Sequence, residues 1–368
     1  MISVFGSLVD QDEILRVSKC MESQWMGFGK DVEIFESKFS EKFAIPNFLM
    51  VDSGSNALFM AVSLLDLPEG SEIIIPSFTW VSCAQAIVLA GHKPVFCDVE
   101  IDSMNVSVDT ITPHITENTG AIMVVHYAGL PVDMDPILEL GFPVIEDAAH
   151  AVDSLYKGKP CGTIGDIGIY SFDAVKNFTV GEGGGITMKS HAHFERAKFM
   201  RYCGIGKSGF DSATNSGSSF NRWWEYKIQE VFIKMLPTNL AANIGLGQLE
   251  KIDRLQNRRK EIWNYYNENL QGVILPLNVD TGSKHSFFTY AIRAKDRDGL
   301  AKFLFDNGVY TTLRYHPLHL NPVYNQENST LSNSETLNED CLSIPIHPRL
   351  TDEEIEKVVF LINEYAAL

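Results

Sequence analysis

Short apolar runs alternate with segments of helical periodicity through the first half of the chain, and this alternation limits the fold more than any other feature. Strand-like runs lie at residues 48–51, 72–75, 94–97, 121–125, 144–145, 168–170 and 185–188. Helical periodicity lies between several of them, at residues 53–65, 81–89 and 133–140. Helices that connect successive strands favour parallel strand order, with helices on both faces of the sheet. The sequence therefore predicts an α/β fold around a mostly parallel sheet.

Two helices are expected before this region. Residues 10–23 have the spacing of an amphipathic helix, with apolar positions at Ile14, Leu15, Val17 and Met21. Residues 32–43 form a second candidate, whose Phe35, Phe39 and Phe43 recur every four residues. Because that spacing keeps side chains on one helix face, the three phenylalanines are expected in the core.

The C-terminal third of the chain predicts a smaller α+β unit. Residues 239–270 have the pattern of one long helix. Beyond about residue 272 the pattern predicts two strands, at 286–293 and 309–313, and two helices, at 298–307 and from Thr351 onwards. Thr351 is followed by three acids, which is typical of a helix N-terminus.

A chain of 368 residues has the length of two domains. We expect a large domain over residues 1–245, which includes a polar loop at about 206–222, and a smaller C-terminal domain over residues 246–368 that includes the linking helix.

Charge and cysteine spacing exclude several classes of function. The net charge of −17 argues against nonspecific nucleic-acid binding. The six cysteines are scattered, with no CxxC pair, which predicts reduced thiols in a cytoplasmic protein and argues against a metal site. Residues 73–92 carry no formal charge, but Pro76 and several polar residues indicate a buried strand, a loop and a helix rather than a membrane span. The start of the chain has no secretory signal pattern.

Polar and aromatic residues gather where the predicted strands end. Ser53, Trp80, His126, Asp147 and Ser171 all follow such runs. In parallel sheets ligands bind outside the carboxyl ends of the strands. The small residues from Ser53 onwards also open a helix, where free N–H groups can bind phosphate, although plain N-capping is the commoner use of serine there.

Lys176 lies between an apolar run and a glycine-rich turn, and Asp147 ends an apolar run upstream. Together they are the pair that a pyridoxal phosphate (PLP) site needs, since a lysine amine forms a Schiff base and a carboxylate keeps the pyridine nitrogen protonated. Each has a simpler alternative. A single lysine is usually a solvated surface charge, and the aspartate could cap the next helix.

The ordered set of motifs resembles the DegT/DnrJ/EryC1/StrS sugar aminotransferase family of fold-type I PLP enzymes, nearest to those that act on nucleotide-linked 4-keto sugars. The resemblance runs nearly end to end. It rests on the segments Ser53–Leu58, Pro76–Trp80, His126–Asp135, Glu146–His150, Gly162–Gly168, Ser171–Gly184, Gln248–Ile252 and Leu342–Pro348. It implies a large domain with a mostly parallel seven-stranded sheet flanked by helices, and a smaller C-terminal α+β domain.

The resemblance implies a catalytic role for Lys176, as the residue that holds the cofactor covalently and moves protons. Asp147 would pair with the pyridine nitrogen. Some relatives have histidine at the lysine position and act as sugar dehydratases, so Lys176 argues against that branch.

Other positions would hold the cofactor or the substrate. The resemblance implies that Trp80 stacks on the cofactor ring, that His150 lies near its phenolic oxygen, and that Ser55, Asn56 and Ser171 bind its phosphate. Two further sets carry over from the family. Asn239 would reach the phosphate from a neighbouring subunit, so a homodimer with shared active sites is expected. The substrate pocket would include Phe28, Tyr315, His316 and His319, although the two histidines could equally be ordinary surface or strand-end residues.

The resemblance implies amino transfer from L-glutamate to C4 of a nucleotide-linked keto-deoxysugar used for surface polysaccharide, lipopolysaccharide or glycan biosynthesis. Amination at C3, or of a keto-cyclitol, is an alternative. A third alternative is a non-catalytic regulatory homologue, against which the presence of Lys176, Asp147, Ser55 and Ser171 argues.

Overall fold

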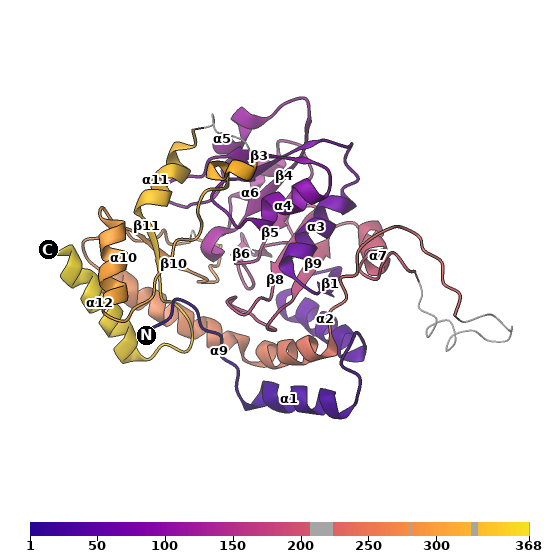
Figure 1. The fold of residues 1–368 in the computed structure, drawn as a ribbon, viewed down its shortest axis with the longest axis horizontal. Coiled ribbons are helices and arrows are strands. Elements are labelled where there is room, and N and C mark those ends of the chain that lie inside the picture. Colours follow the sequence, from indigo (N-terminus) through magenta and orange to yellow (C-terminus); the bar gives the residue numbers. More distant parts are fainter. Residues whose placement is uncertain (207–223, 280, 325–329, 368) are drawn as a thin grey trace.

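A seven-stranded sheet with helices on both faces forms the centre of the molecule (Figure 1). The structure is a computed structural model that describes residues 1–206, 224–279, 281–324 and 330–367. The strand order is β1-β9-β8-β5-β4-β2-β3. The strands are β1 Phe48–Val51, β2 Glu72–Pro76, β3 Lys93–Cys97, β4 Thr119–Val125, β5 Val144–Asp147, β8 Ile167–Ser171 and β9 Gly184–Met188.

Strand direction places the carboxyl ends of most strands at one edge of the sheet. The pairs β2–β3, β2–β4, β4–β5 and β5–β8 are parallel. Strand β9 is antiparallel to both β8 and β1, so β9 alone runs against the rest. The predicted α/β fold with a mostly parallel seven-stranded sheet is confirmed.

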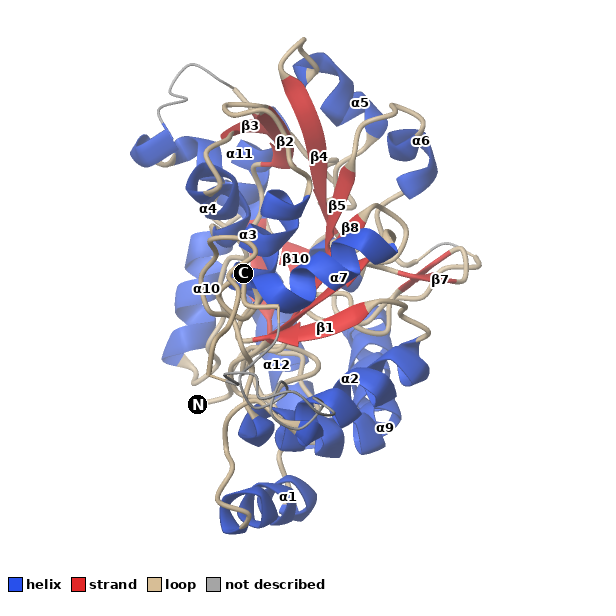
Figure 2. Cartoon of the chain, turned by 90° about the vertical axis from the view of Figure 1, so that its right-hand side faces the viewer, coloured by secondary structure: helices blue, strands red, loops and turns tan. Residues whose placement is uncertain are grey.

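The sheet is buried on both faces, and alternate residues of a strand enter different cores. In β4, Ile122 and Val124 belong to one cluster of buried side chains, whereas Ala121, Met123 and Val125 belong to the other. This follows from the two-residue period of a strand. Figure 2 shows the strands passing between the helices of the two faces.

Helices follow the sequence pattern closely in this part of the chain. One core contains side chains of α2 (Lys30–Phe43) and of the long α9 (Asn239–Asn269), and the other contains side chains of α3 (Gly54–Leu64), α4 (Ser82–Leu89) and α7 (His191–Met200). Short helices α5 (Val108–Ile111) and α6 (Met134–Leu138) follow β3 and β4. The predicted stripe of Phe35, Phe39 and Phe43 is buried.

The C-terminal residues build a second sheet with its own core. Strands β10 (Tyr290–Arg293) and β11 (Cys341–Ile344) pair antiparallel. They are accompanied by α10 (Arg297–Asp306), α11 (Ser332–Asp340) and α12 (Asp352–Ala366). A small hairpin, β6 (Leu155–Tyr156) with β7 (Lys159–Pro160), lies in the large unit. The predicted boundary after residue 245 falls within α9, and the division into two domains stays a prediction.

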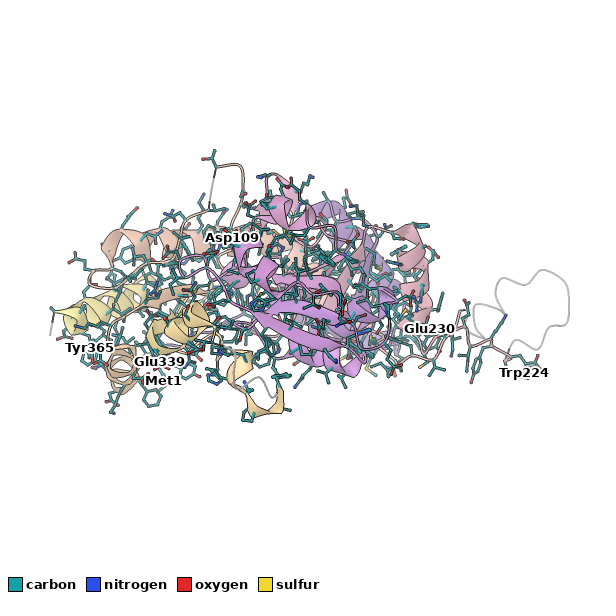
Figure 3. All side chains as sticks on the ribbon, turned by 90° about the horizontal axis from the view of Figure 1, so that it is seen from above. Met1, Asp109, Trp224, Glu230, Glu339 and Tyr365 are labelled. Carbon is teal, nitrogen blue, oxygen red and sulfur yellow. The ribbon has the colours of Figure 1, made fainter. Side chains whose placement is uncertain are left out.

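The two chain ends lie together on the second unit. The Ile2 N–H donates to the Gly308 carbonyl at 2.8 Å, and Figure 3 shows Met1 at the same end of the molecule as Glu339 and Tyr365, with Glu230 and Trp224 at the opposite end. The predicted helix from Thr351 is present as α12, where the Thr351 hydroxyl accepts from the Glu354 N–H at 3.2 Å.

Two strand predictions were wrong in the second unit. Residues 309–313 form no strand and make only single bridges, from Val309 to Ile2 and from Thr312 to Ser343. The strand predicted at 286–293 begins only at Tyr290, because Phe287 has a left-handed backbone (φ 54°) that interrupts extended structure. The pairing partner of β10 is β11, which the sequence pattern did not predict.

Helix α1 (Gln11–Glu22) forms where predicted, but most of its apolar positions do not face the core. Its acid Glu13 is 1% exposed and pairs with Lys251 of α9 at 2.7 Å. Ile14, Leu15 and Met21 are about half exposed instead. Polar side chains of α9, Gln248 and Lys251, contact Glu13. The face of α1 that carries Ile14, Leu15 and Met21 is therefore exposed.

The composition led to expectations about a polar loop, the cysteines, membrane spans and metal sites. The polar loop predicted at about 206–222 lies almost entirely outside the described residues. All six cysteines are free, and the cytoplasmic location inferred from their spacing stays a prediction. Over the described ranges, no helix is both long and apolar enough to cross a bilayer. The same ranges contain no cluster of three or more His, Cys, Asp or Glu side chains that could hold a metal ion.

Candidate active site

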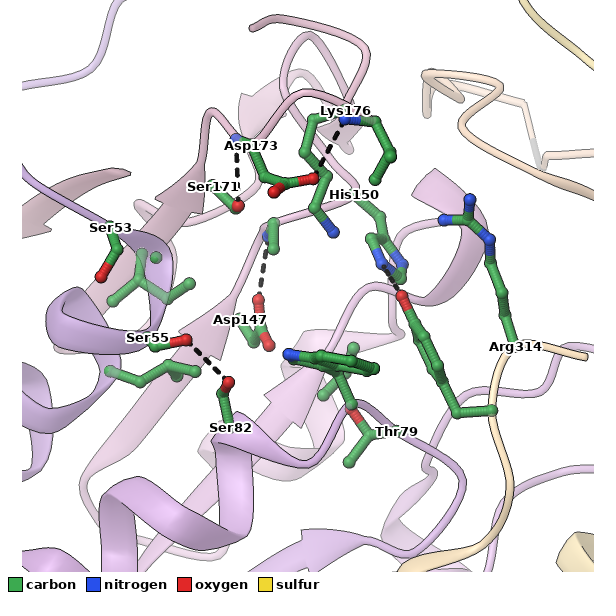
Figure 4. Close-up of a pocket in the computed structure, with 18 of the residues that line it drawn as sticks. Ser53, Ser55, Thr79, Ser82, Asp147, His150, Ser171, Asp173, Lys176 and Arg314 are labelled. Carbon is green, nitrogen blue, oxygen red and sulfur yellow. Dashed lines mark hydrogen bonds between the residues drawn. The ribbon is translucent and has the colours of Figure 1, made fainter. Parts of the chain in front are cut away.

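A cavity of about 470 Å³ opens at the carboxyl ends of the parallel strands (Figure 4). Its size is within the range of small-molecule sites. It gathers seven of the residues singled out from the sequence, which are Ser55, Trp80, Asp147, His150, Ser171, Lys176 and Tyr315. They come from five segments far apart in the chain, and the sheet brings them together.

Lys176 follows β8 in a tight turn, where its backbone N–H donates to the Asp173 carbonyl at 3.0 Å. Its Nζ lies 4.8 Å from the centroid of the Phe288 ring. Burial of the amine, with a further contribution from the nearby Arg314 guanidinium, lowers the pKa of Lys176 from 10.5 to about 8, although Asp147 and Asp173 oppose this. About a tenth of this lysine is therefore the reactive free amine at pH 7, far more than for a lysine with the usual pKa.

The lowered pKa predicts the pH dependence of labelling in the cofactor-free protein. Only the neutral amine is nucleophilic, so the labelling rate of Lys176 should rise about tenfold per pH unit below pH 8 and level off above it. Mass spectrometry of peptides after brief reaction with an amine reagent measures this. Lys302, which is exposed on α10, serves as the control. A Lys176 profile that is still rising steeply above pH 9 would contradict the prediction.

Asp147 is the last residue of β5 and is held by two donors. Its Oδ1 accepts from the Ala149 N–H at 2.9 Å, and its Oδ2 accepts from the Cys83 thiol at 3.1 Å. Burial raises the pKa of Cys83 well above its usual value, so this side chain stays a thiol and a donor. The two contacts fix the carboxylate in the cavity, with lone pairs left to accept from a bound ligand.

Glu146, the preceding residue, faces the opposite side of the sheet and has a different task. It accepts from His126 Nε2 at 2.8 Å, while His126 Nδ1 accepts from the Val132 N–H at 3.0 Å. Its carboxylate also accepts three backbone N–H groups at 2.6–2.8 Å, from Gly162, Ile164 and Gly165. Glu146 is thus fully hydrogen-bonded within the protein, and of the two acids only Asp147 is directed into the cavity.

The N-terminus of α3 forms one end of the cavity together with four serine side chains. Ser53 caps the helix by accepting from the Asn56 N–H at 3.1 Å. Ser55 Oγ lies 2.7 Å from Ser82 Oγ. A Cβ on Gly54 would lie 2.8 Å from Ser171 Cβ, so glycine is needed for this close approach. Hydroxyls around a helix N-terminus are suited to a phosphate, which fits the phosphate of PLP.

Aromatic rings line the other side of the cavity. Trp80 is 53% exposed, and its ring lies 5.4 Å from Tyr315. His150 stacks on Phe288 at 4.1 Å, with its Nε2 3.1 Å from the Tyr315 hydroxyl. Burial, then the charges of Lys176 and Arg314, lower the pKa of His150 well below 6.5, so this ring is neutral.

The structure does not bring the remaining candidates into this cavity. Asn56 donates its side-chain amide to Asp52 Oδ1 at 2.8 Å. Phe28 packs under the Arg201 guanidinium, 4.8 Å from its ring centroid. Asn239 Oδ1 accepts from the Val32 N–H at 3.4 Å, at the start of α9.

The two histidines of the 314–319 segment are also engaged elsewhere. His316 Nδ1 lies 2.8 Å from Asn338 Oδ1 on the surface. His319 is buried, with Nδ1 2.6 Å from Ser77 Oγ and Nε2 3.3 Å from Glu335. Tyr315 alone of this segment's three candidates reaches the cavity.

Sequence reasoning assigned no role to Ser82, Cys83, Phe288 or Arg314. Ser82 and Arg314 line the cavity, whereas Cys83 contacts Asp147 and Phe288 contacts Lys176 from behind it. Ser82 and Cys83 begin the helix after Trp80, so their position near the strand ends was available from the pattern. Arg314 stands directly before Tyr315, but nothing local marks it as buried. Phe288 had no signal, because it reaches His150 and Lys176 only through the fold of the second unit.

Comparisons with known proteins agree on the family. A family model described as the DegT/DnrJ/EryC1/StrS aminotransferase family matches residues 8–363. The chain is 34% identical over 370 residues to the dTDP-4-dehydro-2,3,6-trideoxy-D-glucose 4-aminotransferase of Saccharopolyspora spinosa, and the match covers 97% of this chain and 95% of that protein.

Solved structures show the same fold. The aminotransferase TlmJ from Streptoalloteichus hindustanus has a TM-score of 0.93 at 32% identity, and the match covers 100% of this chain and 99% of that one. Spr1654 from Streptococcus pneumoniae, solved in a PLP form, has a TM-score of 0.89 at 25% identity and coverages of 100% and 98%. The predicted fold type, enzyme class and cofactor are confirmed, and the alternative of a non-catalytic homologue is set aside. The chain is a PLP-dependent enzyme and belongs to the DegT/DnrJ/EryC1/StrS aminotransferase family.

Proposed function

We propose that the protein transfers an amino group from L-glutamate to C4 of a nucleotide-linked keto-deoxysugar, for the synthesis of a surface polysaccharide, lipopolysaccharide or other glycan. The observation that carries the proposal is the meeting of Lys176 and Asp147 in one cavity with a phosphate cradle. The name of the Saccharopolyspora relative, a 4-aminotransferase, supports a 4-keto sugar.

Each residue has a role in this reaction. PLP, when bound, supplies an electron sink for the carbon that bears the amine. Asp147, held by Ala149 and Cys83, would present its carboxylate to the pyridine nitrogen. At the other end, Ser55 and Ser171 would hold the phosphate with the first turn of α3, and Trp80 would provide a flat surface for the ring.

Lys176 Nζ is the group that moves protons in this proposal. Its pKa of about 8 lets it accept and return a proton near neutral pH, which is what efficient acid–base catalysis requires. His150 is neutral and within reach of Tyr315, so it can donate to an oxygen without adding a charge.

We infer that two copies of the chain form the functional unit and share their sites. Ile14, Leu15 and Met21 of α1, with Trp25 and Met26 after it, are exposed apolar side chains that we call the α1 patch. A patch of this kind supports association with a second copy. Asn239 lies outside its own chain's cavity, as expected of a residue that serves the partner's cofactor.

Leu15→Glu should separate the two copies, because a carboxylate in the α1 patch would lose its hydration on association. We expect the wild-type protein to sediment as a dimer and this variant as a monomer that binds PLP more weakly. Phe360→Glu, which alters an exposed apolar residue of α12, should remain dimeric. A wild-type protein that sediments as a monomer would refute the shared site.

The proposed reaction is tested with a panel of dTDP-, UDP- and GDP-linked keto-sugars. Each is incubated with L-glutamate and the PLP-loaded enzyme, and products are identified by mass spectrometry and NMR. We expect amination at C4 for at least one sugar and none with Lys176→Ala. Amination only at C3, or only of a keto-cyclitol, would replace the proposed substrate, and no amination of any ketone would refute the proposal.

A further inference from the structure

A buried arginine in the cavity has no acid to neutralise it. Arg314 is 5% exposed and lines the cavity. Its Nε is buried and makes no hydrogen bond. Across the described ranges no carboxylate lies within ion-pair distance of its guanidinium, although many other arginines there have such a partner. Since buried charges are normally paired, this arrangement indicates a site for an anion that the chain itself does not supply.

Two aromatic rings hold the guanidinium in place. Arg314 Cζ lies 4.4 Å from the centroid of the Phe5 ring and 4.5 Å from that of Phe288. Phe288 is also the ring against which the Lys176 amine lies, at 4.8 Å. The unpaired cation is thus fixed close to the reacting amine before any substrate arrives, which reduces the cost of binding.

The position of Arg314 separates it from the phosphate cradle. Figure 4 shows Ser53, Ser55 and Ser82 on one side of the cavity and Arg314 on the other, with Asp147 between them. The cofactor phosphate is therefore accounted for at the α3 end. In the proposed reaction, the substrates are the other source of an anion for Arg314.

We propose that Arg314 binds the α-carboxylate of the amino donor, an inference that rests on the proposed aminotransferase function. A guanidinium binds a carboxylate through two parallel hydrogen bonds, which fixes the direction of the donor as well as its affinity. The α-carboxylate is only two bonds from the nitrogen that reacts, so a cation beside the catalytic lysine is well placed for it. The diphosphate of a sugar nucleotide lies across the sugar ring from C4, and belongs toward the cavity mouth.

The first half of the reaction tests this without any sugar. The PLP-loaded enzyme is mixed with L-glutamate, and the loss of cofactor absorbance gives the apparent affinity and the limiting rate. Arg314→Gln should weaken the apparent affinity for L-glutamate by roughly 10- to 100-fold, the range for hydrogen bonds to a charged group. Arg314→Lys, which keeps the charge but not the paired geometry, should recover part of this loss.

Amides of the donor identify which carboxylate is bound. Wild-type preference for L-glutamate over its α-amide, L-isoglutamine, should collapse in Arg314→Gln, whereas preference over its γ-amide, L-glutamine, should stay the same. Arg297→Gln, which makes the same charge change on α10, should alter neither ratio. Circular dichroism and PLP absorbance confirm that each variant is folded and loaded.

The outcomes separate the two proposals. An unchanged glutamate affinity in Arg314→Gln, with a raised KM for the keto-sugar, would assign Arg314 to the diphosphate and overturn the inference. Collapse of the γ-amide preference instead would also overturn it. A wild-type enzyme that takes an amino group from no amino acid would refute the proposed function itself.

Discussion

Replacing Lys176 with alanine should reduce turnover by about 10⁴-fold or more, because one side chain provides both the covalent link to the cofactor and the proton transfer. The variant should still bind PLP at the α3 cradle, but without the visible absorbance of the lysine-linked cofactor. The measurement is steady-state amination of the accepted sugar, with an absorbance spectrum of each purified protein.

Two further variants make this result specific. Lys176→Arg keeps a positive charge in the cavity but cannot form the link, so it should be as inactive as the alanine variant. Lys284→Ala, which removes a lysine paired with Asp153 at the surface, should leave turnover unchanged. Wild-type turnover in Lys176→Ala would refute the assignment of the catalytic lysine.

Asp147→Asn should slow the reaction by about 10²- to 10³-fold, the scale on which a single electrostatic contact to a reacting system is lost. The amide is nearly the same shape and can still accept from the Ala149 N–H, so the fold should survive. It carries no charge, however, and cannot keep the pyridine nitrogen protonated. PLP should also dissociate more readily, by about tenfold.

Asp173→Asn is the matched control for charge, because Asp173 also lines the cavity. If Asp147 acts through the ring nitrogen, the Asp173 variant should keep most of its activity. Similar losses in the two variants would mean that only the total charge of the cavity matters.

The pKa of Lys176 gives an independent measure of both neighbours. The Asp147 carboxylate raises this pKa and the Arg314 guanidinium lowers it. In the cofactor-free protein, Asp147→Asn should therefore move the labelling profile of Lys176 below pH 8, and Arg314→Gln should move it above. Shifts in the same direction for the two variants would contradict the electrostatic account.

The parts of the site that the sequence predicted are those tied to local pattern. Asp147 and Ser171 end apolar strands, and strand ends of a parallel sheet share one edge, so their meeting followed from periodicity. The turn at Ser53 was likewise marked by small residues before a helix. The roles of these residues, in contrast, came from the family resemblance.

Tertiary packing decided what the sequence could not indicate. His319 lies only four residues from Tyr315 in the sequence, and Tyr315 lines the cavity. The His319 ring nevertheless contacts Ser77 and Glu335 outside the cavity. The spacing of residues 10–23 predicted an amphipathic helix, but in α1 the acid Glu13 is buried against Lys251 while Ile14 and Leu15 are about half exposed. Such choices depend on which side chains a neighbouring element presents, and no local pattern contains that information.

The opposite directions of Glu146 and Asp147 have a consequence for how this active site can vary. The two acids have different roles because they are consecutive residues of β5, so their side chains point to opposite faces of the sheet. An insertion of one residue at the start of this strand would move Glu146 into the place of Asp147, on the cavity face of the sheet. Ile145 would then take the place of Glu146, and the 162–165 loop would lose its acceptor. The chemistry of the enzyme therefore depends on keeping the number of residues within β5 unchanged. Length changes before β5 should be tolerated only where the preceding loop, rather than the strand, absorbs them.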